Sequence, residues 1–316
     1  MSAYLVTGGA GFIGSHLVEA LVHRGEPVRV LDDLSSGRLE NLSGVLEHIE
    51  FIQGDVADAN VTAGAVQGVD CVFHLAALAS VPASVERPLD CHAACTTGTI
   101  VLLDSARRAG VRRVVFAGSS AVYGERSGGS RREDEVPEPL SPYAAAKAAG
   151  EMYCRAFWAS YGLETVVLRY FNVFGPRQNP RSQYAAVIPQ WITALLEGRR
   201  PVIYGDGRQS RDFTSVDNVV HANLLAASSP TAAGRTINIA EGRSFDLLHL
   251  LDVLRQVMNV EVEPVFAPPR TGDVRFSRAD ISLAQQLLGY QPQVDFEEGL
   301  RRTVAYYRQD HRRFQG

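Results

Sequence analysis

A chain of 316 residues, 46% of them hydrophobic, is long enough for one large domain or two modest ones with a sizeable core. Its formal charge of −4 provides no broad basic field, so we expect neither nucleic acid nor a membrane among its partners. The cysteines Cys71, Cys91, Cys95 and Cys154 lack the CxxC spacing of metal and redox sites, and no apolar run could cross a bilayer, so we expect a cytoplasmic protein with reduced core thiols and no metal.

The first half of the chain alternates short β-branched runs with amphipathic stretches. Strands are expected at 4–7, 28–31, 49–53, 71–75, 114–117 and 165–168, and the clearest helices at 12–23, 97–108 and 142–161. Such alternation predicts a doubly wound α/β fold, in which helices cover both faces of a parallel sheet. We assign residues 1–170 to this Rossmann domain.

Beyond about residue 169 the loops become longer and richer in glycine, proline and arginine. Helices are expected at 187–197, 217–227, 247–258 and 282–287. Because an arginine-rich lobe suits an anionic substrate, we expect a smaller C-terminal α/β lobe, residues 171–316, to bind it, with residues 212–242 returning to the first domain. The segment "ERSGGSRREDE", residues 125–135, is expected to be a mobile surface loop.

The stretch "YLVTGGAGFIGSHLVEAL" places Gly8, Gly11 and Gly14 between a strand and a helix. Glycines at this spacing allow a tight turn, let a pyrophosphate approach the backbone and permit close helix packing. The helix N-terminus at Phe12 and Ile13 adds N–H donors and the positive end of a dipole. The motif therefore predicts a dinucleotide site.

Further cofactor contacts are expected where the next strands end. The carboxylate of Asp32 would accept both hydroxyls of an adenosine ribose and repel a 2′-phosphate, which favours NAD over NADP. Asp55 either approaches the adenine or caps a helix, and His74 is expected to be a hydrogen-bonded strand-end histidine because it lacks metal-ligand partners at suitable spacing. The other candidates at these strand ends are Asp33, Ser35, Val56, Leu75, Ala76 and Ala77.

The stretch "SPYAAAKAAG" contains the single lysine of the chain, Lys147, four residues after Tyr143. Side chains at this spacing share one face of a helix, and an ammonium beside a phenol favours the phenolate, which can act as a base towards a hydroxyl. Arginine could not act as the same compact point charge. The stretch "FAGSSAVYG" brings Ser119 and Ser120 to the carboxyl edge of the sheet, where a hydroxyl can orient or relay that proton. These four residues are the catalytic candidates.

In order along the chain, "TGGAGFIGS", Asp32, "HLAA", "SSAVYG", "SPYAAAK" and "LRYFNVFGP" resemble the extended short-chain dehydrogenase/reductase superfamily, and within it the nucleotide-sugar 4-epimerases. The resemblance covers nearly the whole chain. It implies an NAD-dependent UDP-sugar 4-epimerase in which Tyr143 removes the proton of the sugar 4-hydroxyl while C4 gives hydride to nicotinamide. The transient 4-keto sugar then turns over and receives the hydride on its opposite face.

Related families divert the ketone, and the residues after Ser119 discriminate among them. Sugar 4,6-dehydratases typically carry Asp-Glu there, and UDP-glucuronate decarboxylases place Glu at the second position, whereas this chain has Ser120 and Ala121. Without that carboxylate, return of the hydride is the favoured outcome. Alternatives that stay open are a UDP-glucuronate 4-epimerase, a nucleotide-sugar dehydratase and, more remotely, a non-catalytic NAD-sensing regulator.

The resemblance also implies a UDP-sugar substrate. Arg211 in "SRDF" and Arg270 in "PPRTGD" match arginines that clamp a diphosphate, Asn172 matches a polar contact, and Tyr204 matches an aromatic that packs on uracil. Ser277 stands where epimerases restricted to UDP-glucose and UDP-galactose tend to carry tyrosine, so room is expected for the 2-acetamido group of UDP-GlcNAc and UDP-GalNAc. The remaining substrate candidates are Ser80, Ser119 and Val187.

The chain departs from the family pattern at Cys95, where asparagine is usual. A thiol cannot offer the amide hydrogen bonds, so how tightly NAD is held stays open. The family commonly pairs the helices that here begin near Thr97 and Pro142 into a four-helix bundle of two subunits. The alanine-rich face of residues 144–149 permits close packing, so a homodimer is expected.

Overall fold

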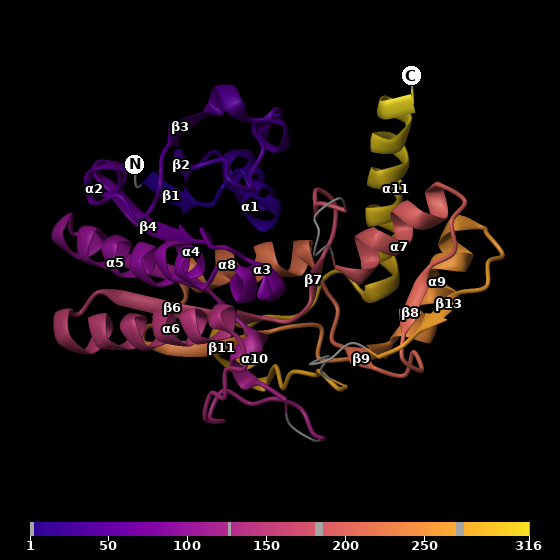
Figure 1. Cartoon of the computed structure of the whole chain (residues 1–316). Helices are drawn as coiled ribbons and strands as arrows, with labels where there is room; N and C mark the ends of the chain where they lie inside the picture. The colour runs from indigo at the N-terminus through magenta and orange to yellow at the C-terminus, as the bar shows by residue number, and fades with distance from the viewer. Residues whose placement is uncertain (1–2, 126–127, 181–185, 270–274, 316) are drawn as a thin grey trace.

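The computed structural model describes residues 3–125, 128–180, 186–269 and 275–315, with side chains up to residue 309 (Figure 1). In this part of the chain the largest sheet has seven strands in the order β11-β6-β5-β4-β1-β2-β3, and all neighbours are parallel. Its strands are β1 (Ala3–Thr7), β2 (Val28–Asp32), β3 (Ile49–Gln53), β4 (Val69–His74), β5 (Arg113–Ser119), β6 (Glu164–Tyr170) and β11 (Arg235–Ile239). The predicted doubly wound fold is confirmed.

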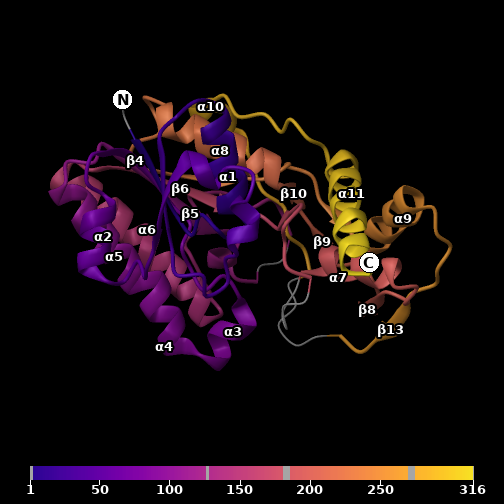
Figure 2. The same ribbon diagram turned by 90° about the horizontal axis from the view of Figure 1, so that it is seen from above.

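Helices cover both faces of this sheet (Figure 2). One layer comprises α1 (Phe12–His23), α8 (Val216–Ser228) and α10 (Ser282–Leu288), and the other α2 (Ala59–Ala65), α5 (Gly98–Arg108) and α6 (Pro142–Tyr161). Successive strand residues point to opposite faces, so Val6 and Val115 pack in the α1 layer while their neighbours Leu5 and Val114 pack in the α6 layer. Strands buried on both faces explain the continuous apolar runs in the sequence.

The ends of α6 show why its bounds can be predicted from sequence. The Ser141 hydroxyl accepts the N–H of Ala144 at 3.2 Å, and Pro142 takes the first helical position, where a missing N–H costs nothing. The helix stops at Gly162, whose φ of 72° is left-handed. The predicted limits of this helix are confirmed at both ends.

A second lobe follows, built on α7 (Val187–Leu196), α9 (Leu247–Met258) and α11 (Phe296–Gln315), with the parallel pair β8 (Val202–Tyr204) and β13 (Val265–Ala267). The sequence did not lead us to expect α11. Its buried residues Phe296, Leu300, Val304 and Tyr307 recur at helical spacing, and the Phe296 ring stacks on that of Phe245 with centroids 4.4 Å apart.

Short strands join the two lobes. After β6 the chain forms β7 (Val173–Phe174), which pairs with β10 (Thr214–Ser215), and β9 (Ser210–Arg211) pairs with β12 (Phe245–Asp246). From β10 the chain runs through α8 into β11 at the edge of the large sheet. The carboxyl end of β6 therefore leads directly into the region between the lobes, as Figure 2 shows.

Two expectations about local structure were wrong. The helix expected from residue 97 begins earlier, at Pro88, because α4 (Pro88–Cys91) and a π-helical turn, η3 (His92–Thr97), run into α5. The segment expected to be a mobile loop is anchored beyond residue 130. Arg131 is 6% exposed, donates its N–H to the carbonyl of Arg278 at 2.8 Å and accepts the N–H of Asp280 at 2.9 Å.

Candidate active site

The turn between β1 and α1 brings a helix N-terminus to the carboxyl edge of the sheet. Gly8 has a φ of 68°, and a Cβ there would lie 2.7 Å from the backbone of the loop after β4, so glycine is required. A Cβ on Gly14 would lie 2.2 Å from the Gly8 carbonyl oxygen. Gly11 is the N-cap of α1 and has no side chain that could bond to the helix N-terminus. The first turn of α1, which begins with Phe12 and Ile13, contains no acidic residue. The glycines thus let β1, α1 and the loop after β4 pack closely, and the helix end offers N–H donors and a positive dipole end to a pyrophosphate.

Asp32 is the last residue of β2, lies beside this turn and is buried. Its carboxylate accepts the N–H of Ala10 at 2.9 Å and that of Leu34 at 2.8 Å. Burial raises the pKa of this carboxyl, and the two hydrogen bonds act against the shift. A Cβ on Gly37 would lie 2.7 Å from Oδ1, so only a glycine can pack this close to the carboxylate.

The other predicted cofactor residues follow β2, β3 and β4 along the same edge. Ser35 donates its N–H and its hydroxyl to Oδ1 of Asp33 at 2.9 and 2.6 Å. Asp55 accepts the N–H of Ala57 at 2.8 Å, and Asp58 is the residue that caps α2, so the interpretation of Asp55 as a helix cap is wrong. Val56 is buried, and the half-buried residues after β4 are Leu75, Ala76 and Ala77.

His74 at the end of β4 is buried and hydrogen-bonded through both ring nitrogens. Nδ1 lies 2.7 Å from the Thr7 hydroxyl and Nε2 lies 3.0 Å from the Thr99 hydroxyl. Burial, and then the charge of Lys147, lower its pKa to about 3, so the ring is neutral. The expected strand-end role of His74 is confirmed. Among the described residues, no group of three His, Cys, Asp or Glu side chains could hold a metal ion.

α6 brings Tyr143 and Lys147 to the end of β5. Lys147 is 4% exposed and donates from Nζ to the carbonyl of Ala117 at 2.8 Å. The same Nζ lies 5.0 Å from the centre of the Phe116 ring and 5.9 Å from that of the Tyr143 ring. Tyr143 itself is half-buried. A compact cation is therefore held between the strand end and a phenol that a ligand can still reach.

Ser119 and Ser120 lie at the point where β5 turns away. The Ser119 hydroxyl accepts the N–H of Ala121 at 3.2 Å and caps the short 3-10 turn η4 (Ser120–Tyr123). Both serines are half-buried. Ser119 is the last residue of the strand that Lys147 holds at Ala117, and Ser120 begins the turn that follows it.

Three predicted substrate residues meet between the lobes. Asn172 follows β6 with a φ of 32°, unusual for a residue other than glycine, and its Nδ2 lies 3.4 Å from the Asp212 carbonyl and 3.5 Å from the Ser277 hydroxyl. Ser277 donates its N–H to the carbonyl of Ser210 at 3.1 Å, and Arg211 follows on β9. Asn172, Arg211 and Ser277 thus come from three distant segments to one place.

The remaining substrate candidates lie further along the two lobes. Tyr204 is half-buried on β8, and its carbonyl accepts from Gln209 Nε2 at 2.7 Å. Ser80 caps α3 (Val81–Glu86) by accepting the N–H of Ala83, and Val187 opens α7. Arg270 lies outside the described residues.

Sequence reasoning missed two buried residues that support the site. The Ser84 hydroxyl accepts the N–H of Tyr143 at 3.1 Å and so ties α3 to the start of α6. The Asp212 carboxylate accepts the N–H of Ala279 and that of Glu241, both at 3.1 Å, and so holds three segments of the substrate region together. Ser84 gave no sequence signal, whereas Asp212 lies within the quoted "SRDF" stretch.

The cysteines are core residues, as expected. All four are buried and free. Cys95 lies in η3, and it packs with Cys91 and Ala146 in a cluster that the Tyr143 ring also contacts. Burial raises the pKa of the Cys91 thiol to about 12, so this thiol stays protonated. At Cys95 the chain thus has a small apolar contact behind the phenol.

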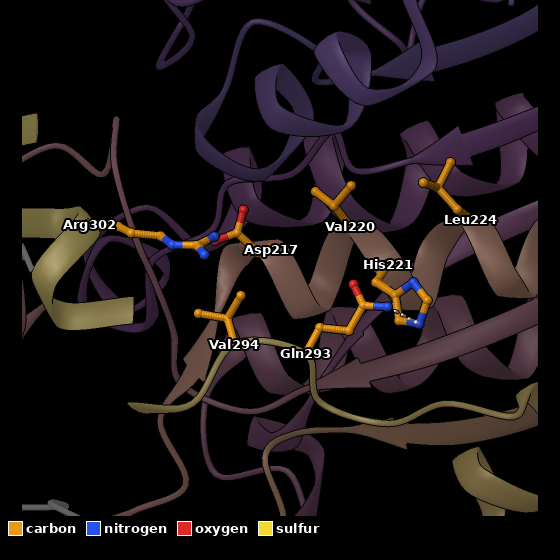
Figure 3. A pocket seen from close by; sticks show the side chains of 7 residues that line it. All are labelled: Asp217, Val220, His221, Leu224, Gln293, Val294 and Arg302. Atoms are coloured by element: carbon orange, nitrogen blue, oxygen red, sulfur yellow. Dashed lines mark hydrogen bonds and ion pairs between the residues drawn. The ribbon is translucent and has the colours of Figure 1, made fainter. Parts of the chain in front are cut away.

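A separate groove of about 390 Å³ lies between α8, α11 and the segment before α11 (Figure 3). Asp217 and Arg302 point towards one another there and form an ion pair of 3.1 Å, and the Gln293 amide lies 3.3 Å from His221 Nε2. None of the predicted site residues lines this groove, so it is not part of the candidate active site.

The chain matches the family model described as "NAD dependent epimerase/dehydratase family" over residues 4–240. It is 41% identical to the UDP-glucose 4-epimerase of Mycolicibacterium smegmatis over 308 residues, which is 96% of this chain and 98% of that protein.

Two solved structures superpose on nearly its whole length. The UDP-N-acetylglucosamine 4-epimerase of Methanobrevibacter ruminantium M1, in complex with UDP-N-acetylmuramic acid, has a TM-score of 0.94 and 43% identity, covering 98% of this chain and 99% of that one. The UDP-glucose 4-epimerase of Thermotoga maritima, with UDP-glucose, has a TM-score of 0.93 and 40% identity with the same coverage.

Proposed function

The chain belongs to the NAD dependent epimerase/dehydratase family, and on that premise we propose that it is a UDP-sugar 4-epimerase. Its preferred pair would be UDP-GlcNAc and UDP-GalNAc, with UDP-glucose and UDP-galactose as a second pair. The observation that carries the proposal is the end of β5, where Lys147 binds the Ala117 carbonyl beside the Tyr143 ring and Ser119 ends the strand, while the next two positions, Ser120 and Ala121, carry no carboxylate.

The residues at the sheet edge fit NAD, the cofactor of this family. The glycine turn packs more closely than side chains would permit and brings the N-terminus of α1 to the sheet edge, and the carboxylate of Asp32 lies next to it at the end of β2. When bound, NAD supplies a reversible hydride acceptor. The residues that would hold it are Gly8, Gly11, Phe12, Ile13, Gly14, Asp32, Asp33, Ser35, Asp55, Val56, Leu75, Ala76, Ala77, Tyr143 and Lys147.

Tyr143 would accept the proton of the sugar 4-hydroxyl, since it is the half-buried phenol at the strand end. Lys147 stabilises negative charge on the Tyr143 oxygen and reaches the nicotinamide ribose, and its hydrogen bond to Ala117 limits where the ammonium can move. The Ser119 hydroxyl orients the substrate oxygen or relays its proton. These roles serve both the removal of hydride from C4 and its return to C4, whichever direction the reaction takes.

The missing carboxylate separates epimerisation from elimination. Removing water or carbon dioxide from the ketone calls for a further acid–base group next to the sugar, and Ser120 and Ala121 supply none. The ketone therefore loses neither water nor carbon dioxide before the hydride returns. For the same reason a nucleotide-sugar dehydratase is disfavoured.

The sugar preference rests on the cluster of Asn172 and Ser277. A serine whose hydroxyl lies 3.5 Å from Asn172 leaves space that a tyrosine ring would fill, and an acetamido group needs such space. The relative from Methanobrevibacter ruminantium, a UDP-N-acetylglucosamine 4-epimerase, supports this preference. We further propose that Arg211 and Arg270 bind the diphosphate, Tyr204 the uracil, and Ser80 and Val187 the sugar side of the pocket.

We also propose that the protein works as a homodimer in the cytoplasm. A mostly apolar hollow of about 270 Å³ lies between α6 and the α4–η3 segment, lined by Pro88, His92, Thr96, Pro142, Ala145, Ala146 and Ala149. Met152 on α6 and Leu89 on α4 are exposed apolar side chains beside these elements. Within the described residues, no helix has the length and apolar character needed to cross a membrane. The buried free thiols suit a reducing compartment.

The proposal is tested by incubating the purified protein, without added NAD, with UDP-GlcNAc, UDP-glucose and UDP-glucuronate in parallel and identifying products by NMR. UDP-GalNAc is the expected main product, and Ser277→Tyr is expected to lose about tenfold or more of the kcat/KM for UDP-GlcNAc while keeping that for UDP-glucose. Conversion of UDP-glucose with UDP-GlcNAc untouched would overturn the sugar preference. Conversion of UDP-glucuronate alone, or loss of water, would favour the alternatives, and inactivity towards all three would favour the non-catalytic regulator.

A further inference from the structure

α6 carries a second buried charge on the face of Tyr143 and Lys147. Glu151 follows Lys147 by four residues, so the two side chains are neighbours on the helix. The Glu151 side chain is only 3% exposed, about as buried as Lys147. Because a charge is kept at such depth only when it is paired, the partners of Glu151 define its role.

The first partner is Arg169 on β6. Its Nε lies 3.1 and 3.2 Å from the two oxygens of Glu151, and its Nη2 lies 2.7 Å from Oε2. The guanidinium carbon stands 4.7 Å from the centre of the Tyr123 ring, and the Tyr123 hydroxyl donates to Asn238 Oδ1 at 2.6 Å. The pair therefore continues into the turn that Ser120 begins.

This ion pair lies against the strand end that carries the proposed catalytic serine. Arg169 is the partner of Gly118 in the β5–β6 register, and a Cβ on Gly118 would lie 3.2 Å from Glu151 Oε1. Lys147 holds the carbonyl of Ala117, one residue earlier. Lys147 and Glu151 thus contact consecutive residues of β5, immediately before Ser119.

The buried positive charges at the end of β5 outnumber the buried negative charge of Glu151. Two buried cations lie near one buried carboxylate: Arg169 forms an ion pair with Glu151, and Lys147 stands one helical turn before Glu151 on α6. Burial raises the pKa of the Glu151 carboxyl, while hydrogen bonds from Arg169 and then the charges of Arg169 and Lys147 lower it, so both cations stabilise its charged form. Without the carboxylate, Arg169 would be left unpaired, and Lys147 would lose a buried negative charge one helical turn away.

We propose that Glu151 is a positioning residue for the reaction, because its carboxylate, held by Arg169 against β5 and one helical turn from Lys147, keeps Lys147 on the Ala117 carbonyl and so sets the ammonium relative to Tyr143 and Ser119. The inference rests on the proposed function, since the reaction whose rate it affects is the epimerisation. Glu151 touches neither substrate nor cofactor in this role. Its effect should therefore fall on kcat more than on KM.

The chain offers a matched control at the other end of the same two strands. Glu164 begins β6 and pairs with Arg113, the first residue of β5, at 2.7 Å, and Arg113 is as buried as Arg169. Glu151→Gln and Glu164→Gln each take one carboxylate from a buried arginine of the β5–β6 pair. Only the first change lies at the carboxyl edge.

The test compares kcat, KM and thermal midpoint for wild type, Glu151→Gln, Glu164→Gln and the double variant Glu151→Gln with Arg169→Met. We expect Glu151→Gln to lower kcat about tenfold or more with KM within about threefold, and Glu164→Gln to keep kcat within about twofold. The double variant removes the uncompensated arginine, so we expect its thermal midpoint to recover while kcat stays low.

A double variant that regains wild-type kcat along with its stability would show that Glu151 is merely structural. Wild-type kcat in Glu151→Gln, or an equal loss in Glu164→Gln, would also overturn the inference. If Glu151→Gln does not fold, the folded double variant decides by its kcat alone. A wild-type protein without epimerase activity would instead refute the proposed function.

Discussion

At the scale of single residues, the chemistry depends on Lys147, the one lysine among 31 basic residues. Its Nζ lies between the Ala117 carbonyl and the rings of Phe116 and Tyr143, in a space closed to solvent. An ammonium fits there because it is compact and donates in any direction, whereas a guanidinium is planar and longer. The position therefore needs a lysine rather than a positive charge of any kind.

Lys147→Arg tests this point, because it keeps the charge and changes the shape. We expect kcat to fall by about a hundredfold or more while the circular dichroism spectrum stays that of the wild type. The matched variant Lys147→Met, which removes the charge and keeps the length, should lose a similar factor. An arginine variant with near-wild-type kcat would show that charge alone suffices.

Residue identities at the site could be read from the sequence where a spacing has a physical reason. Tyr143 and Lys147 share a helix face by their spacing, and Gly8 is forced by a positive φ. Ser84 could not be found this way, because its bond to the Tyr143 N–H joins segments that only the fold brings together. Glu151 on α6 could not be found this way either, since its partner Arg169 lies on β6.

At the scale of elements, the junction around Asp212 joins β9, the β11–β12 loop and residues 277–280. Its carboxylate accepts from Ala279 and Glu241, and its carbonyl accepts from Asn172. Burial raises the pKa of Asp212 to about 7 and that of Glu241 to about 7, despite the backbone hydrogen bonds that each accepts. The folded protein therefore binds protons that the unfolded chain releases between about pH 4 and 7.

Stability should follow from this difference in a definite direction. Because the folded-state pKa of each group lies above the unfolded one, the contribution of Asp212 and Glu241 to the free energy of unfolding falls as pH rises from about 4 to 7 and levels off above. Each group contributes up to about 1.4 kcal/mol per pH unit. Urea titrations across this range should give a more positive slope of the free energy of unfolding against pH for Asp212→Asn than for the wild type.

Asp280→Asn is the control for that experiment. The Asp280 carboxyl lies nearby and is partly exposed, and its hydrogen bonds with Ser282 hold its pKa below the ordinary value, so it titrates outside the window. Its variant should keep the wild-type slope. Identical slopes for wild type and Asp212→Asn would contradict the assigned protonation.

Element bounds were predictable where caps are local, as at Ser141 and Gly162 of α6. They were wrong for the helix before residue 97, since a π-helical turn depends on how α4 and α5 pack on α6. The anchored segment after residue 130 could not be foreseen either. Its composition is that of a loop, and its hydrogen bonds to Arg278 and Asp280 are made by a distant part of the chain.

At the scale of the whole molecule, the carboxyl edge of the large sheet faces the second lobe. The alternation of strands and helices was enough to predict the Rossmann fold, because parallel strands bury both faces and leave long apolar runs. The second lobe was harder to predict, since its short strands pair between distant segments, as β8 does with β13. The α11 helix does show a regular apolar spacing that the sequence analysis overlooked.

The proposed homodimer concerns the association of two whole molecules. Met152 is 53% exposed on α6, so Met152→Arg would place a charge on the proposed bundle face. We expect light scattering to show a dimer for the wild type and mainly monomer for this variant, since an unpaired charge in an apolar interface is costly. Val202→Arg on β8, at the far side of the second lobe, should remain dimeric (Figure 1). Equal masses for all three proteins would refute the proposed interface.

The most direct test of the epimerase assignment follows the hydrogen at C4. UDP-GlcNAc labelled with deuterium at C4 is incubated with the purified protein without added NAD, and the product is examined by NMR and mass spectrometry. We predict UDP-GalNAc of unchanged mass with the deuterium still at C4, and no product from Tyr143→Phe. Loss of the label to solvent, loss of water from the sugar, or an unimpaired Tyr143→Phe variant would contradict the account.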